Sequence, residues 1–184
     1  MGNLSKHFDK SEFRCQCGCG GENPSKKLIE RLEQLFDLMD AKAIIVTSGY
    51  RCPNYSASIG GYRNDAHTCN IAADVIVNKQ GGGTYTSEDI AEAAERIGFG
   101  GIGLMSGACH LDNRDSESYV NNHWYGDERD GRNNIKTFQR GTVFPGEKPK
   151  EEPKEEPKVP EPKEELTKEE LLAELKALYE KYSI

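Results

Sequence analysis

The C-terminal part of the chain cannot form a hydrophobic core, and this confines any globular fold to the residues before it. Residues 147–184 contain 12 Glu, 8 Lys and 5 of the 8 Pro in the sequence. Repeated Pro-Lys-Glu-Glu units offer too little apolar surface to offset the entropy lost on ordering, and proline stiffens them into a solvated spacer. We therefore predict a folded domain over residues 1–144, a charged linker over 145–165 and a helix over 166–184.

The composition excludes several classes of protein. The formal net charge is −7 at pH 7, and the sequence has no basic cluster that would neutralise the phosphates of a nucleic acid. No apolar run approaches the roughly 20 residues that cross a bilayer. The first residues lack the apolar core of a signal peptide, so we expect synthesis in the cytoplasm without such a peptide.

Hydrophobic spacing within the first part predicts an α+β domain, in which helices flank a small antiparallel sheet. Apolar residues at helical spacing predict a helix over residues 23–40, capped by Asn23 with Pro24 in its first position. A second helix is expected to run to about Ile97, with Ser87 as its cap. Short strands are expected over residues 43–47 and 71–77, at Leu104 and over 108–112, with loops at 48–53 and 60–65.

The predicted C-terminal helix is amphipathic. Thr167 and Glu170 form a capping box at its start, and leucines and tyrosines between Leu171 and Tyr182 form one apolar stripe. A helix of this length is not stable alone in water. Two interpretations follow, in which the helix either folds back onto the domain or serves for docking or self-association.

Three side chains of the predicted domain form a candidate metal-binding set. Asp74 interrupts an apolar strand, where a lone carboxylate is costly unless it is paired or bound to a metal. His67 lies in a polar loop, and His110 shares a strand face with Asp112 because alternate side chains point the same way. Two imidazoles and one carboxylate match a zinc set with a fourth position open for water. The alternative is that each is an ordinary hydrogen-bonded or surface residue.

The sequence around these residues resembles the peptidase M15 family of zinc D-Ala-D-Ala carboxypeptidases and related peptidoglycan peptidases, which include phage endolysins. The family pattern is Ser-x-His-x-x-Gly-x-Ala-x-Asp, and His67, Ala72 and Asp74 match it. The resemblance covers roughly residues 4–140 and rests on ordered segments at Thr47–Pro53, Gly60–Gly61, Asp65–Val75 and Cys109–Arg114. It implies the zinc peptidase fold shared by M15 and hedgehog-like proteins.

The resemblance also implies roles for single residues. His67, Asp74 and His110 would be the zinc ligands. Arg51 would hold a carboxylate or carbonyl of the wall peptide, a role that suits its fixed-charge guanidinium, and the alternative is that it braces its loop. The candidate substrate-binding residues are Arg51, Tyr50 and Ser48.

Two positions depart from the family pattern. Asn70 replaces a glycine, which is a mild change because Asn tolerates left-handed backbone. Asp65 replaces a serine, and it either accepts a hydrogen bond from the His67 ring or weakens the binding of a substrate carboxylate.

The general base is less well marked. Many relatives carry an acid three residues before the last zinc histidine, and Gly107 occupies that position here. We therefore predict Asp112 as the catalytic base, with the alternative that it only orients His110 or Arg114. Weaker candidates are His123, for stabilising the oxyanion, and Trp124 and Tyr125, which line the cleft or belong to the core.

The six cysteines allow fifteen full disulfide pairings, among which the sequence does not choose. Cys69 and Cys109 each adjoin the proposed metal centre, so a bridge between them is one option. In a reducing cytoplasm all six would stay thiols, whereas in a cell-wall or gut-like exterior they could oxidise. Cys15, Cys17 and Cys19 alternate, and binding of a second metal is an alternative for them although their spacing is not that of usual zinc sites.

Together these features predict zinc-dependent hydrolysis of a peptide bond in bacterial peptidoglycan stem peptides, of carboxypeptidase or endopeptidase type. The alternatives are a non-catalytic wall-binding module and a structural protein that zinc stabilises. The expected partner is the wall peptide, with no nucleic acid and no membrane span. A wall substrate without a signal peptide favours a phage-type lysin that other factors release.

Overall fold

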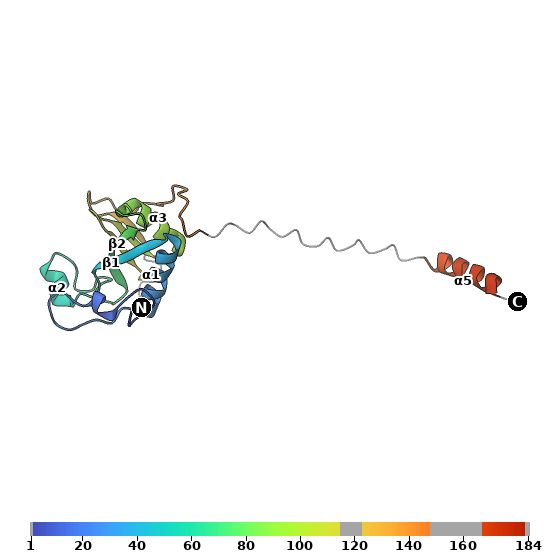
Figure 1. Ribbon diagram of the computed structural model, residues 1–184, viewed down its shortest axis with the longest axis horizontal. Coiled ribbons are helices and arrows are strands. Elements are labelled where there is room, and N and C mark those ends of the chain that lie inside the picture. The colour runs from blue at the N-terminus through green and yellow to red at the C-terminus, as the bar shows by residue number, and fades with distance from the viewer. Residues whose placement is uncertain (1, 115–122, 148–166, 183–184) are drawn as a thin grey trace. The chain divides into compact units, whose positions relative to one another are not determined.

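The computed structural model describes residues 2–114, 123–147 and 167–182. The chain forms two compact units, Met1–Lys148 and Pro149–Ile184, of which the first contains the sheet and the second contains helix α5 (Lys168–Tyr182; Figure 1). Most of the predicted linker lies outside the described residues, so the boundaries at 145 and 165 stay predictions. Within the described ranges, no helix is long and apolar enough to span a membrane.

The first unit is an α+β domain built on a small, mainly antiparallel sheet, as the sequence predicts. The strand order is β1-β2-β4-β3-β5, and the parallel pair is β3 with β5. The strands are β1 (Ala41–Ser48), β2 (Ala72–Lys79), β3 (Gly101–Leu104), β4 (Cys109–Asp112) and β5 (Trp124–Asp127). The helices are the 3-10 helix η1 (Lys10–Phe13) and α1 (Lys26–Leu38), α2 (Pro53–Ser58) and α3 (Ser87–Ile97).

Helices α1 and α3 pack against the sheet and bury the core (Figure 1). Val75 and Val77 of β2 and Leu111 of β4 point into this core. Because successive strand residues point to opposite faces, Asp74 and His110 point away from it. The sheet therefore separates the helix-packed core from the polar side chains that the sequence singles out.

Both predicted helices form, but their caps differ from the prediction. Helix α1 begins after Ser25, whose hydroxyl accepts a hydrogen bond from the Leu28 amide at 3.0 Å, so Asn23 is not its cap. Thr86 caps α3 in the same way, with 3.1 Å from the Asp89 amide to its hydroxyl. Ser87 instead donates to the Ala108 carbonyl at 2.6 Å, because it is buried between the helix and the sheet.

Three elements of the domain lie outside the sequence prediction, namely η1, α2 and β5. Helix α2 occupies Pro53–Ser58, which is too short to show a helical period. Strand β5 covers Trp124–Asp127 and pairs with β3, so that Gly101 lies opposite Trp124. Its pairing partner is more than twenty residues away, and four residues give no local signal of such a contact.

Helix α5 forms over Lys168–Tyr182, as the sequence predicts. The six large apolar side chains of its predicted stripe are each at least 48% exposed. The predicted capping box stays a prediction because the Glu170 side chain lies outside the described residues. Docking and self-association also stay predictions.

Candidate metal centre

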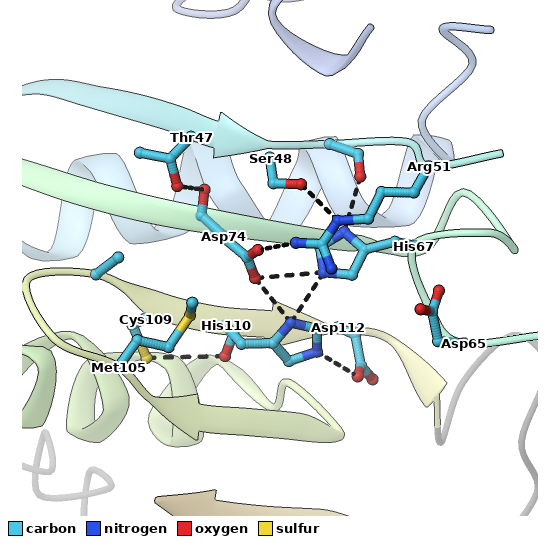
Figure 2. A network of polar contacts seen from close by, with 12 residues as sticks. Thr47, Ser48, Arg51, Asp65, His67, Asp74, Met105, Cys109, His110 and Asp112 are labelled. Atoms are coloured by element: carbon cyan, nitrogen blue, oxygen red, sulfur yellow. Dashed lines mark hydrogen bonds and ion pairs between the residues drawn. The ribbon is translucent and has the colours of Figure 1, made fainter. Parts of the chain in front are cut away.

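Strand register brings two of the three predicted donors together. Asp74 on β2 lies directly opposite His110 on β4, and 2.9 Å separates Asp74 Oδ1 from His110 Nδ1. His67 reaches them from the loop before β2, with Nε2 at 3.2 Å from His110 Nδ1 and 3.3 Å from Asp74 Oδ1 (Figure 2). All three side chains are buried. Residues 43 positions apart in the chain therefore direct one nitrogen or oxygen each toward a common point.

The spacing of these atoms fits a small divalent cation. Zinc binds histidine nitrogen and carboxylate oxygen at 2.0–2.2 Å in tetrahedral geometry, which places neighbouring donors about 3.3 Å apart. The three observed separations of 2.9, 3.2 and 3.3 Å lie close to this value. Three donors also leave one tetrahedral position for a water or substrate atom. His67, Asp74 and His110 thus form a candidate metal site in both chemistry and geometry.

The backbone fixes the orientation of the His67 ring. Its Nδ1 lies 2.7 Å from the Gly49 carbonyl oxygen, and because that oxygen can only accept, Nδ1 carries the proton. The unprotonated Nε2 is left to face the other donors, which is the arrangement that metal-ligating histidines use. The acceptor for His67 is therefore the Gly49 carbonyl. Asp65 does not have this role, which is the first of the two roles that the sequence suggests for it.

The departures from the family pattern have structural explanations. Asp65 accepts a hydrogen bond from the Ser56 hydroxyl and another, at 2.9 Å, from the Thr68 amide. It thereby closes the loop that carries His67. Asn70 has φ of 62°, the left-handed conformation that a glycine adopts easily and that the sequence led us to expect.

Asp112 is fully buried and holds His110 from behind. Its Oδ2 lies 3.0 Å from His110 Nε2, which leaves His110 Nδ1 to face Asp74 (Figure 2). The Arg114 side chain donates to both carboxylate oxygens, from Nε at 3.0 Å and from Nη2 at 2.6 Å. These contacts use both oxygens and support the second of the two predicted roles, in which Asp112 orients His110.

The ionisation of these groups follows from their contacts. Burial raises the pKa of Asp74 and of Asp112, but hydrogen bonds from their histidine and arginine partners outweigh it and hold both pKa values well below the usual range. Burial lowers the pKa of His110, but its bonds to Asp112 and Asp74 raise it to about 10. Without a metal, His110 thus keeps a proton between two carboxylates. A metal must displace that proton, so metal affinity rises with pH.

Arg51 lies beside the donors but is already engaged. Its Nη2 donates to Asp74 Oδ2, and its Nε donates to the Ser48 hydroxyl at 2.8 Å. The structure brings Arg51 to the cleft, with Ser48 behind it. Tyr50 does not line the cleft, because its ring packs against Gly21, where a Cβ atom would lie 2.1 Å from Tyr50 Cε1.

A cleft of about 770 Å³ opens over the three donors. The two aromatic candidates have different positions relative to this cleft. Trp124 lines the cleft and stacks edge-on against His110 with ring centroids 6.0 Å apart, whereas Tyr125 is buried in the core. His123 is not among the cleft residues. The charged residues that line the cleft are Arg51, Asp65, His67, Asp74, His110, Arg114 and Glu128.

Glu128 is the cleft carboxylate that sequence reasoning missed. It follows β5 directly, and its amide donates to the Leu104 carbonyl at 2.9 Å. Gly103 lies opposite His110 on β3, and a Cβ atom at Gly103 would come within 3.0 Å of Glu128 Oε1. The missing side chain at Gly103 thus leaves room for a carboxylate beside His110. No local pattern marks Glu128, because its position depends on the β3–β5 pairing.

All six cysteines are thiols in the structure. Cys69 is exposed and Cys109 is buried in the core, so the bridge considered between them is not formed.

One comparison with known proteins agrees with this geometry. A search of curated proteins finds no match for the chain. A family model described as Peptidase M15 matches residues 6–112, which are more than half of the chain and include all three donors and Asp112. The chain therefore belongs to the peptidase M15 family.

Proposed function

We propose that this chain is a zinc-dependent peptidase that hydrolyses a peptide bond in peptidoglycan stem peptides. The observation that carries the proposal is the convergence of His67, Asp74 and His110 at the base of a charged cleft, with donor atoms 2.9–3.3 Å apart. Membership of the peptidase M15 family supports peptide hydrolysis as the reaction. The bacterial wall is then the proposed place of action, as in a phage-type lysin.

His67, Asp74 and His110 would hold the zinc ion. When bound, a zinc ion supplies Lewis acidity that activates water and polarises a carbonyl group. The protein supports this chemistry by placing an acceptor behind each ring, Gly49 behind His67 and Asp112 behind His110. His67 Nε2 thus faces the other donors without a proton, and His110 Nδ1 faces them once the metal has displaced its proton.

Glu128 is the proposed proton acceptor. A general base must lie within hydrogen-bond reach of the proton that it takes. Asp112 is fully buried, and both of its carboxylate oxygens already accept hydrogen bonds from His110 or Arg114. Glu128 lines the cleft beside His110 and can take a proton from water and pass it to the leaving amine. Asp112 is then a positioning residue.

Two guanidinium groups give the cleft its affinity for a peptide. Arg51 and Arg114 both line it, and each is less than one-fifth exposed. Partly buried guanidinium groups bind carboxylates and carbonyls strongly, so we propose that Arg51 orients the wall peptide. Arg114 also lies 5.2 Å from the Trp124 ring centroid, which holds both groups at the cleft wall.

Hydrolysis of purified wall peptides tests the proposal. Zinc-loaded chain is incubated with a stem pentapeptide and with cross-linked stem dimers, and the products are identified by mass spectrometry. We expect cleavage of at least one substrate, which also distinguishes terminal from internal cutting, and no cleavage by His67→Ala. Glu128→Gln should lower kcat by about 10²–10⁴-fold with zinc retained, the range for loss of a general base.

Two results would contradict the proposal. Equal turnover by wild type and His67→Ala would exclude catalysis at this centre. Binding of wall peptide without any turnover would instead support a non-catalytic wall-binding module on the same scaffold.

A further inference from the structure

A cluster of four thiols lies apart from the cleft and has no part in the proposed reaction. Cys15, Cys17 and Cys19 belong to the segment between η1 and α1, and Cys52 immediately precedes α2. Their four Sγ atoms all lie within 4.8 Å of one another. The Sγ atoms of Cys15 and Cys17 are 3.3 Å apart, and those of Cys17 and Cys52 are 3.6 Å apart. Cys52, which is 33 positions after Cys19, completes a set that the sequence shows only in part.

The spacing of the sulfur atoms is that of a metal–thiolate site. Bonded sulfur atoms in a disulfide are about 2.05 Å apart. Four thiolates around zinc at 2.3 Å lie about 3.8 Å apart in tetrahedral geometry. The observed Sγ–Sγ distances of 3.3 and 3.6 Å are much nearer to this thiolate separation than to a disulfide bond length. Four soft sulfur donors without oxygen or nitrogen also select a thiophilic metal over calcium or magnesium.

The backbone around the cluster supports charged sulfur. The Cys52 amide donates to Cys15 Sγ at 3.3 Å, and the Tyr55 amide donates to Cys52 Sγ at 3.4 Å. Hydrogen bonds of this kind favour the thiolate that binds a metal. Gly18 has φ of 81°, a conformation that only glycine adopts easily, and it lets the segment turn so that its three cysteines face Cys52.

We propose that Cys15, Cys17, Cys19 and Cys52 bind a second metal ion, a zinc ion in a closed tetrathiolate site. A closed site has no position for water, so its role is structural. This inference rests on the cysteine cluster and does not depend on the proposed peptidase activity.

The position of the cluster shows what such an ion would stabilise. Cys52 follows Arg51 in the chain, and the Tyr50 amide in the same loop donates to the Phe13 carbonyl at 2.9 Å. The loop also contains Gly49, whose carbonyl orients His67. A zinc ion there would tie the N-terminal segment to the loop that positions both Arg51 and His67.

Cobalt binding tests the proposal in the full-length, reduced chain. Thiolate ligands give Co²⁺ an intense near-ultraviolet charge-transfer absorption that histidine and carboxylate ligands do not. We expect this absorption in wild type, and equally in Asp74→Ala, which lacks a donor of the other centre. Cys17→Ser and Cys19→Ser should lose most of it, whereas Cys69→Ser, also a change at an exposed cysteine, should keep it. Its absence from wild type, or full intensity in Cys17→Ser, would overturn the proposal.

A second measurement needs no variant. In zinc-loaded wild type, Cys17 and Cys19 should resist alkylation until a chelator is added, although both are exposed, whereas Cys69 should react at once. Immediate alkylation of Cys17 and Cys19, or a disulfide within the cluster in the chain as purified, would overturn the proposal. The peptidase could still be active in that case, so the two proposals fail separately.

Discussion

Replacing Asp112 by Asn changes the support of the candidate metal centre without touching a donor. The carboxylate is fully buried, and its Oδ2 accepts from His110 Nε2 at 3.0 Å. Asn has nearly the same shape but no charge, so it leaves the His110 ring in place with a weaker partner. The Asp112→Asn chain should therefore fold and bind zinc, but less tightly.

The expected loss follows from that single contact. Removal of the group that orients a ligating histidine typically lowers metal affinity by about 10–100-fold. At about 1.4 kcal/mol for each factor of ten, this corresponds to about 1.4–2.8 kcal/mol of binding free energy. The loss should appear in the dissociation constant, because all three donors remain.

The assay is a zinc titration in competition with a chromogenic chelator at constant pH. Asp74→Ala lacks one donor of this centre, so the binding step that disappears in this variant is assigned to the centre. Asp127→Asn is the matched control. Asp127 is buried like Asp112 and is paired with Arg129 and Arg132, but it contacts none of the three proposed metal ligands. An unchanged zinc affinity in Asp112→Asn, or an equal loss in the control, would refute the orienting role.

Two further predictions concern the stability of the domain. Gly101→Ala should lower the free energy of unfolding by about 1–3 kcal/mol in urea titrations, because its Cβ would lie 2.2 Å from Asp112 Oδ2; Gly81→Ala, with open space around it, is the control and should change little. Burial raises the pKa of Glu92, but hydrogen bonds from Thr142 and Arg140 outweigh it and lower the pKa to about 2. A lowered carboxyl pKa stabilises the fold above the unfolded value near 4.5 and loses this effect as the pH falls toward 2. Glu92→Gln should therefore make the acid loss of stability less steep, and an unchanged pH profile would contradict this.

The elements that the sequence predicts are those with a local period. The helix expected over residues 23–40 forms as Lys26–Leu38 because its apolar stripe is long, while the choice of cap depends on which hydroxyl reaches a free amide. Strand β5 could not be predicted, since its four residues are ordered by pairing with β3.

The same distinction holds for the site. Asp74 is conspicuous in the sequence because it interrupts an apolar strand, and it draws attention to His67 and His110. Glu128 and Cys52 carry no such mark, because only the folded chain brings Glu128 beside His110 and Cys52 beside the other thiols. Residues whose roles come from long-range pairing are the ones that sequence reasoning misses.

Zinc binding by His67, Asp74 and His110 is tested most directly by a crystal of the full-length chain grown with zinc, with anomalous diffraction data collected on both sides of the zinc absorption edge. We expect a peak about 2.0–2.2 Å from His67 Nε2, Asp74 Oδ1 and His110 Nδ1, the distances typical of zinc ligands. Ordered side chains at these three positions with no peak between them, or imidazole rings turned away from Asp74, would contradict it.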